Sequence, residues 1–311
     1  MKKELLTFKD PKSPISEIFR SLRTNIQFMC SDKDLKTILI TSTVSGEGKS
    51  LVTANLAITF AQAGKKVILV DADMRKGRQH QIFNILQKPG LSNYLSNIIE
   101  KAEDAKPKSK NTKELDIYIK STDIENLWLI PAGNVPPNPS ELLMNERMKE
   151  LIKKLKKDYD IIIFDGTPSL LVTDAIVLSR MIDSTIIVTS YKETKMENLK
   201  KVKRDIQNVG GKIAGIVLNK MPMSTKKYEN SYYYGKHEYK STDLISESYD
   251  FSISEPTIKK EDEVLDELQE YLDSSRDIEK NDIRKTKKGK RLKWLMFILI
   301  FYPELMTELE V

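Results

Sequence analysis

The sequence has few of the residues that build disulfide-linked or metal-stapled folds. Its 311 residues include one cysteine, Cys30, and two histidines, His80 and His237. A single cysteine excludes an intramolecular disulfide framework and is what we expect of a cytoplasmic protein. The sequence contains no Cys/His cluster of the kind that forms a structural metal site. The fold must therefore depend on an apolar core, for which a hydrophobic content of 40% is sufficient.

Long hydrophobic runs are also missing. The longest, WLMFILIFY at residues 294–302, is far shorter than the roughly 20 residues that a membrane-spanning helix needs. The first ten residues, MKKELLTFKD, have no apolar stretch typical of a signal peptide. Residues 284–293, RKTKKGKRLK, carry seven positive charges and no negative one. A basic run before a Trp-led apolar segment is typical of a helix lying on an anionic membrane surface. Packing of this segment on the globular domain or on a protein partner is the alternative.

Continuous apolar runs alternate with helical patterns through the first two thirds of the chain. The runs are TILITS, KVILVDAD, LWLIPAG, DIIIFDG, STIIVTS and KIAGIVLN, and the helical patterns include LVTANLAITFAQAG and SELLMNERMKELIKKLKK. Apolar strands that do not alternate with polar residues, separated by helices, indicate a parallel sheet covered on both faces. We predict an α/β fold with a doubly wound, mostly parallel sheet.

Composition divides the chain into five parts. We predict a polar lead (1–12), the α/β domain (13–223), a tyrosine cluster (224–242), a charged amphipathic segment (243–283), and a basic run with a short apolar segment (284–311). The last three form a flexible C-terminal tail in this prediction.

A glycine-containing loop, TSTVSGEGKS, lies between the first apolar run and the helical pattern after it. That context is what a phosphate-binding loop of the P-loop NTPase type requires. Backbone N–H groups there can surround a phosphate, Lys49 can reach the β- and γ-phosphates of ATP, and the Ser50 hydroxyl can ligate Mg²⁺. The match is incomplete, because Thr43 stands where the full pattern has glycine. We predict nucleotide contacts at Ser45, Gly46, Glu47, Gly48, Lys49, Ser50 and Leu51.

Three aspartates follow predicted strands. Asp71 and Asp73 come after VILV, and Asp165 comes after IIIF. The carboxyl ends of parallel strands meet where ligands bind, and carboxylates there can hold Mg²⁺. Any one of them alone could be a helix N-cap. We predict Ser50, Asp73 and Asp165 as metal ligands, and Lys49, Asp71, Asp73 and Asp165 as the catalytic group.

Five tyrosines are concentrated in STKKYENSYYYGKHEYKST, within a polar, lysine-rich context. Three of them are consecutive and would point to both faces of a strand, which argues against a half-buried strand. They are either an adhesive aromatic patch or substrates of a modifying reaction. The tyrosines are Tyr228, Tyr232, Tyr233, Tyr234 and Tyr239.

In this combination the chain resembles the bacterial tyrosine kinases that regulate capsule and exopolysaccharide synthesis. The resemblance covers residues 13–240 and rests on SPISEIFRSLRTNIQF, SGEGKS, VILVDADMRK, GLSNYL, AGNVPPNPSELL, the strand that ends in Asp165 and the tyrosine cluster. It implies an ATP- and Mg²⁺-dependent autokinase in which Asp71 is the base toward tyrosine. The clustered tyrosines are then the phosphoacceptors, modified between neighbouring subunits.

The resemblance also implies partners. Glu17, Arg20 and Arg23 match the E-x2-R-x2-R motif through which subunits of this family assemble, so we expect a homo-oligomer. Their spacing places them on one helix face, where an ordinary ion-pair ladder is the alternative. The family further implies a membrane-embedded activator protein and a location at the inner face of the plasma membrane. We expect no nucleic-acid partner.

Two departures from the family pattern lie near the site. The third motif reads Asp165-Gly166-Thr167-Pro168 rather than Asp-x-Pro-Pro, and Gly77 replaces a common proline. We expect both to loosen loops near the site and to lower activity.

Two other functions remain open. A spatial-organising ATPase of the division-site or partitioning type shares the sheet and the loop, but usually has a lysine early in the loop, where this chain has Val44 and Ser45. A kinase-derived scaffold with little catalysis is the other.

Overall fold

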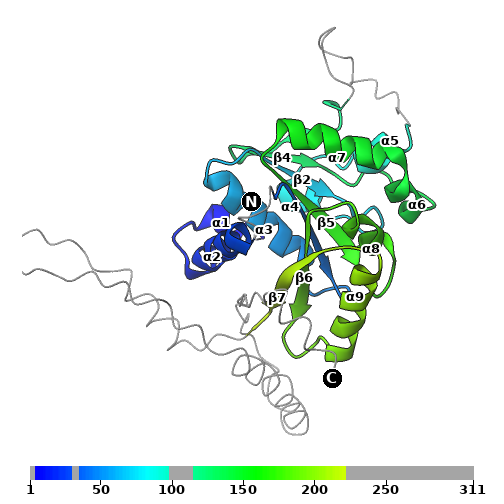
Figure 1. Ribbon diagram of the computed structural model, residues 1–311. Helices are drawn as coiled ribbons and strands as arrows, with labels where there is room; N and C mark the ends of the chain where they lie inside the picture. Colours follow the sequence, from blue (N-terminus) through cyan, green and yellow to red (C-terminus); the bar gives the residue numbers. More distant parts are fainter. Residues whose placement is uncertain (1–3, 30–34, 98–114, 222–311) are drawn as a thin grey trace, which may run out of the picture. The chain divides into compact units, whose positions relative to one another are not determined.

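The computed structural model describes residues 4–29, 35–97 and 115–221 (Figure 1). The predicted α/β fold is confirmed: the described residues form a seven-stranded sheet in the order β3-β4-β2-β5-β1-β6-β7. The strands are β1 (Thr37–Ser42), β2 (Val67–Asp71), β3 (Lys120–Ser121), β4 (Leu127–Ile130), β5 (Ile161–Pro168), β6 (Ser184–Ser190) and β7 (Ile213–Asn219).

The sheet is parallel except at one edge, where β3 runs antiparallel to β4. Every residue of β1, β2 and β6 is buried, as expected of strands covered on both faces. The register pairs Asp71 with Asp165 across β2 and β5, and Ile40 with Asp165 across β1 and β5. The ends of these three central strands therefore bring Asp71, in the second nucleotide-binding motif (Asp71 to Asp73), and Asp165, in the third, to the edge of the sheet from which the glycine loop leaves.

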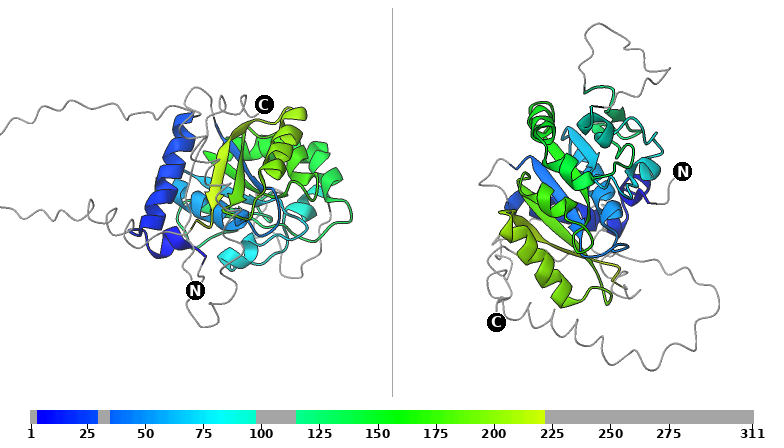
Figure 2. Two further views of the ribbon diagram at one scale, coloured as in Figure 1. Left: turned by 90° about the horizontal axis from the view of Figure 1, so that it is seen from below. Right: turned by 90° about the vertical axis from the view of Figure 1, so that its right-hand side faces the viewer.

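Helices cover both faces of the sheet (Figures 1 and 2). They are α1 (Leu6–Lys9), α2 (Pro14–Met29), α3 (Lys49–Gln62), α4 (Gln79–Phe83), α5 (Leu91–Leu95), α6 (Pro139–Met144), α7 (Glu146–Asp158), α8 (Asp174–Ser179) and α9 (Met196–Asn208). One hydrophobic core joins α2 and α3 to one face, and a second joins α5, α7 and α8 to the other. Neighbouring residues of β1 divide between them: Ile38 and Ile40 lie in the first core and Leu39 in the second, as strand geometry requires.

The start of the described chain packs on the helix that follows the glycine loop. Thr7 of α1 is fully buried, and its backbone N–H donates to Asn55 Oδ1 of α3 at 3.0 Å. The Asn55 amide donates to the carbonyl oxygens of Glu4 and Leu51, at 2.8 and 2.9 Å. The Gln62 amide donates to the Thr7 carbonyl at 3.1 Å. The predicted polar lead therefore includes a docked helical turn tied to α3 by side chains of α3 itself.

Several predicted segments lie outside the described residues. They include the whole predicted C-terminal tail, with its tyrosine cluster, amphipathic segment, basic run and apolar segment. Within the part of the chain that is described, no helix has both the length and the apolar character needed to cross a membrane.

The contact of Asn55 with the first turn yields a prediction. We expect Asn55→Ala to lower the free energy of unfolding by about 1–3 kcal/mol, because it leaves the Thr7 N–H and the Glu4 carbonyl without their partners. Asn25→Ala, on the exposed side of α2, is the matched control, since it makes the same change of helix propensity without breaking such a contact. Urea unfolding of both variants measures the difference. Equal stabilities would show that the first turn contributes nothing through Asn55.

Candidate functional site

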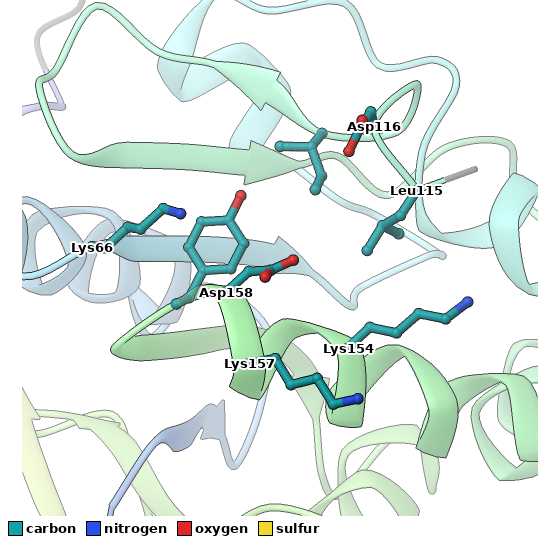
Figure 3. Close-up of a pocket in the computed structure, with 8 residues that line it drawn as sticks. Lys66, Leu115, Asp116, Lys154, Lys157 and Asp158 are labelled. Atoms are coloured by element: carbon teal, nitrogen blue, oxygen red, sulfur yellow. The ribbon is translucent and has the colours of Figure 1, made fainter. Parts of the chain in front are cut away.

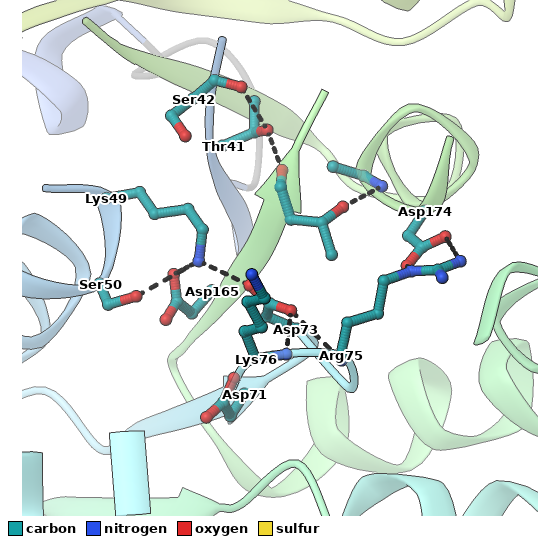
Figure 4. Close-up of polar contacts among 12 residues, drawn as sticks. Thr41, Ser42, Lys49, Ser50, Asp71, Asp73, Arg75, Lys76, Asp165 and Asp174 are labelled. Carbon is teal, nitrogen blue, oxygen red and sulfur yellow. Dashed lines mark hydrogen bonds and ion pairs between the residues drawn. The ribbon is translucent and has the colours of Figure 1, made fainter. Parts of the chain in front are cut away.

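The predicted catalytic residues lie together at the carboxyl ends of β1, β2 and β5 (Figure 4). The Lys49 ammonium lies 3.1 Å from Asp73 Oδ2, 3.5 Å from Asp165 Oδ1 and 3.3 Å from Ser50 Oγ. Burial acts to lower the pKa of Lys49, but the carboxylates of Asp165, Asp73 and Asp71 outweigh it and raise this pKa above its ordinary value. Lys49 therefore keeps its charge inside the site.

The predicted metal ligands lie around the Lys49 ammonium group. Ser50, Asp73 and Asp165 each have an oxygen within 3.5 Å of Lys49 Nζ, so two carboxylates and a hydroxyl are already arranged around a positive charge. That donor set fits Mg²⁺, which prefers a few carboxylates together with substrate phosphate oxygens. Among the described residues, no group of three or more acidic, His or Cys side chains forms an all-protein cage.

Asp71 lies in the least solvated part of the site. It is fully buried, and its Oδ2 accepts the backbone N–H of Gln79 at 3.0 Å. Burial and the neighbouring charge of Asp165 raise the pKa of Asp71 well above its ordinary range, against the opposing charge of Lys49. Its Oδ1 has no hydrogen-bond partner among the described residues. Asp71 can therefore accept a proton more readily than an exposed aspartate can.

Two glycines shape the loop before α3. Gly46 and Gly48 have φ angles of 93° and 94°, in the left-handed region that favours glycine. A Cβ on Gly48 would also coincide with the side chain of Asn219, whose amide donates to the Glu47 carbonyl at 2.8 Å. The end of β7 therefore supports the loop from behind, and Gly48 is required both by its backbone angle and by this close approach.

Glu47 serves the loop rather than a ligand. Its buried carboxylate accepts the backbone N–H groups of Thr43 and Val44, at 2.6 and 2.9 Å, and the hydroxyls of Thr43 and Thr194. These bonds occupy the carboxylate, and the nucleotide contact at Glu47 stays a prediction for its backbone. Thr43 is not among the described residues with positive φ, so its position in the loop does not need the glycine of the full pattern.

The two departures from the family pattern are tightly packed. A Cβ on Gly77 would lie 2.7 Å from Asp71 Oδ2 and 2.6 Å from Ala132 Cβ, and one on Gly166 would lie 2.9 Å from Leu39 Cδ1. Such distances require neighbouring atoms to shift. Both glycines therefore permit a close approach of neighbouring atoms, and the expected lowering of activity by the two departures stays a prediction.

Thr167, where the family has its first proline, is bonded through its carbonyl and its hydroxyl. Its carbonyl accepts the Thr41 hydroxyl at 2.7 Å, and its own hydroxyl accepts the backbone N–H of Ala175 at 3.3 Å (Figure 4). These bonds tie the third motif to β1 and to α8.

Sequence reasoning missed two supports of the site. The Arg75 guanidinium binds Asp174 with two hydrogen bonds, of 2.7 and 3.0 Å, and the Ser140 hydroxyl also donates to Asp174. This joins the loop after β2 to α8 and α6. Gln79 is the second support of the site, and its amide contacts both Ser50 and Asp165. The sequence offered a weak signal for Arg75, which follows the aspartate motif, and none for Gln79.

The predicted oligomer residues all have partners within the chain. Glu17 pairs with Arg20, which also donates to the Pro11 carbonyl, and Arg23 donates to the Thr59 carbonyl of α3 at 2.9 Å. The Glu17 side chain remains 67% exposed and can meet another molecule. Their role in assembly stays a prediction.

Pockets on the described residues include two that differ in their relation to the site. The one of about 340 Å³ adjoins the glycine loop and is lined by Leu6, Ile15, Phe19, Gly48, Leu51, Glu193, Asn219 and Lys220. The other, of about 520 Å³, is lined by α7 and by residues that precede β2 and β5 (Figure 3). Lys66 there lies 5.0 Å from the ring centre of Tyr159, whose pKa rises to about 12 through burial and the charges of Asp158 and Asp116. It opens at the end of the sheet opposite the aspartates, so it takes no part in their chemistry.

Comparison with known proteins identifies relatives of this chain. Residues 35–216 match a family described as an AAA domain. The chain is 40% identical over 226 residues to a putative tyrosine-protein kinase, CapB, of Staphylococcus aureus, which is 73% of this chain and 92% of the relative. It is 37% identical over 235 residues to the tyrosine-protein kinase YwqD of Bacillus subtilis, which is 76% and 92%. The solved structure of the chimerical protein CapA2B2 is similar with a TM-score of 0.64 and 39% identity, over 72% of this chain and 93% of that one.

The interior position of Glu47 yields a prediction. We expect Glu47→Gln to weaken binding of a fluorescent ATP analogue by about 10- to 100-fold, because an amide cannot accept all four of the bonds that shape the loop. Glu150→Gln, on the exposed side of α7, makes the same change without loop contacts and is the control. Fluorescence titration measures both. An affinity for Glu47→Gln equal to that of the control would show that this carboxylate does not shape the loop for binding.

Proposed function

The chain belongs to the bacterial tyrosine kinases of the capsule and exopolysaccharide type, and we propose that it transfers the γ-phosphate of ATP to tyrosine at the site around Lys49. The observation that carries this proposal is the Lys49 ammonium between the carboxylates of Asp73 and Asp165. Asp71, at the end of β2, is paired with Asp165 on β5. Relatives named as tyrosine kinases argue against the spatial-organising ATPase. The altered third motif, which alone favours an inactive scaffold, keeps Asp165 beside Lys49.

Each residue has a distinct part in the proposed reaction. The N–H groups of the glycine loop and of the first turn of α3 bind the phosphates, and Lys49 neutralises their charge. Mg²⁺, when bound, adds positive charge at the phosphate oxygens, and Ser50, Asp73 and Asp165 would hold it. The tyrosine oxygen bonds to the γ-phosphorus while the bond from that phosphorus to the bridging oxygen breaks and ADP leaves.

Asp71 takes the phenolic proton in this proposal. An ordinary aspartate is a weak base toward a phenol, whose pKa is about 10. The raised pKa of Asp71 narrows the difference between its own pKa and that of the phenol. A loose transition state needs little activation of the nucleophile, so the proton can leave late, after the new bond has begun to form.

We further propose that the acceptors are the five clustered tyrosines of a neighbouring subunit. They lie outside the described residues, and the family resemblance and the sequence support their role. The chain from Asn219 to Tyr228 can extend by at most about 30 Å, which is enough to reach an adjoining molecule. Each phosphate adds about −1.5 to −2 charges, so full modification turns a basic segment acidic and favours separation of the subunits.

The proposed partner is a membrane-embedded activator that regulates the kinase at the inner face of the plasma membrane. The length of the relatives supports a separate activator chain. The matching region makes up 92% of CapB but 31% of the tyrosine-protein kinase Wzc of Salmonella typhi. A domain of this kind therefore occurs both nearly alone and as part of a longer protein. The basic run and apolar segment of the tail would add contact with anionic lipid.

A mixing experiment tests the kinase and the direction of transfer together. We expect Lys49→Met to lower autophosphorylation at least about 100-fold, because a charge that stabilises the transition state is lost. The same variant should become labelled when mixed with tagged protein in which the five tyrosines are phenylalanine. Lys65→Met, which changes an exposed lysine after α3, is the control and should label itself normally.

Anti-phosphotyrosine blotting reads both outcomes of the mixing experiment. Full labelling of Lys49→Met alone would reject the site. If Lys49→Met stayed unlabelled in the mixture while Lys65→Met labelled itself normally, transfer would occur within one chain.

Vesicle sedimentation tests the proposed lipid contact. We expect the full chain to sediment with anionic vesicles at low salt and to be partly released as salt rises, because screening weakens the attraction of the basic run. A chain ending at Asp282 should stay in the supernatant with the same vesicles. Equal sedimentation of the two chains would rule out the tail as the anchor and leave the activator protein as the route to the membrane.

A further inference from the structure

Gln79, the first residue of α4, connects all three motifs of the site. Its side chain is fully buried, and its amide nitrogen donates to the Ser50 carbonyl at 3.0 Å and to Asp165 Oδ2 at 2.8 Å. Its backbone N–H donates to Asp71 Oδ2 at 3.0 Å. One residue therefore contacts the helix after the glycine loop and the aspartates at the ends of β2 and β5.

The contact with Asp165 is the shortest that this carboxylate makes among the described side chains. Lys49 Nζ and Thr53 Oγ1 both approach its Oδ1, at 3.5 and 3.4 Å. Of the side chains that the structure describes, Gln79 is the one that donates to Oδ2. The 2.8 Å bond therefore fixes the rotation of the carboxylate and leaves Oδ1 directed toward Lys49, in the part of the site that suits a cation.

The amide of Gln79 is itself held in one orientation. A glutamine NH₂ group has two hydrogens, and the Ser50 carbonyl and Asp165 Oδ2 take one each. A flipped amide would place its oxygen against two acceptors, which is unfavourable. Because the Ser50 carbonyl belongs to the first turn of α3, Gln79 couples the rotation of Asp165 to the helix that also carries the Ser50 hydroxyl.

We propose that Gln79 is a positioning residue that presents Asp165 to the metal ion of the kinase. This inference rests on the proposed function, in which Ser50, Asp73 and Asp165 hold Mg²⁺. Hydrogen bonds to ligating carboxylates typically change metal affinity or activity by about 10- to 100-fold when they are removed. Gln79 neither binds the metal nor touches the transferred phosphate.

The test measures the binding of Mg²⁺ without turnover. Gln79→Met keeps the length of the side chain and removes its donors. We expect it to raise the Mg²⁺ concentration that gives half-maximal binding of a fluorescent ADP analogue by about 10- to 100-fold. Gln81→Met, an exposed position on the same helix, makes the same substitution and should leave this concentration unchanged. Thermal unfolding without nucleotide checks that each variant is folded.

A second variant keeps the test decisive if Gln79→Met does not fold. Gln79→Asn retains the amide but is one methylene shorter, so it can satisfy only one of the two acceptors, and we expect a smaller rise in the same direction. An Mg²⁺ dependence equal to that of the unchanged protein in a folded Gln79 variant overturns the inference. Failure of the unchanged protein to bind nucleotide or to phosphorylate tyrosine would instead overturn the proposed function.

Discussion

A buried concentration of negative charge at the ends of β2 and β5 is the constraint on which the rest of the site depends. Three carboxylates, Asp71, Asp73 and Asp165, lie near one ammonium group, that of Lys49. Buried charges are costly unless they are paired and hydrogen-bonded, and one lysine does not balance three aspartates. Burial and the charge of Asp165 raise the pKa of Asp71, so this carboxylate takes up a proton more readily than an exposed aspartate does. The remaining negative charge suits a divalent cation, so the cluster explains both the proposed base and the proposed metal site.

The surrounding elements keep this cluster in place through contacts that are distant in the chain. Thr194 and Asn219 bind Glu47 and so hold the glycine loop, while the Arg75–Asp174 pair holds the loop after β2. None of these side chains needs to contact a substrate for its loss to matter. A site built on strand ends and supported in this way can keep phosphate, metal and base within fractions of an ångström of a productive geometry.

The path of the chain relates the site to its proposed acceptors. The last strand, β7, ends at Asn219, whose amide contacts the glycine loop. The tyrosine cluster begins only a few residues later in the sequence. A change in charge of that cluster on phosphorylation would therefore arise on a segment covalently joined to a residue that supports the nucleotide site.

Local pattern in the sequence was sufficient for the fold and for the main residues of the site. Continuous apolar runs indicated a parallel sheet, and the position of Asp71, Asp73 and Asp165 after such runs indicated that they converge, because parallel strands end at one edge. Tertiary structure alone decided that the Glu47 carboxylate turns inward, that Gly77 is tightly packed and that Gln79 joins the motifs. The physical reason is that these roles depend on partners far apart in the chain. Thr194 and Glu47 are 147 positions apart and Gln79 and Asp165 are 86 apart, and no periodicity or motif records a contact that exists only after the sheet has assembled.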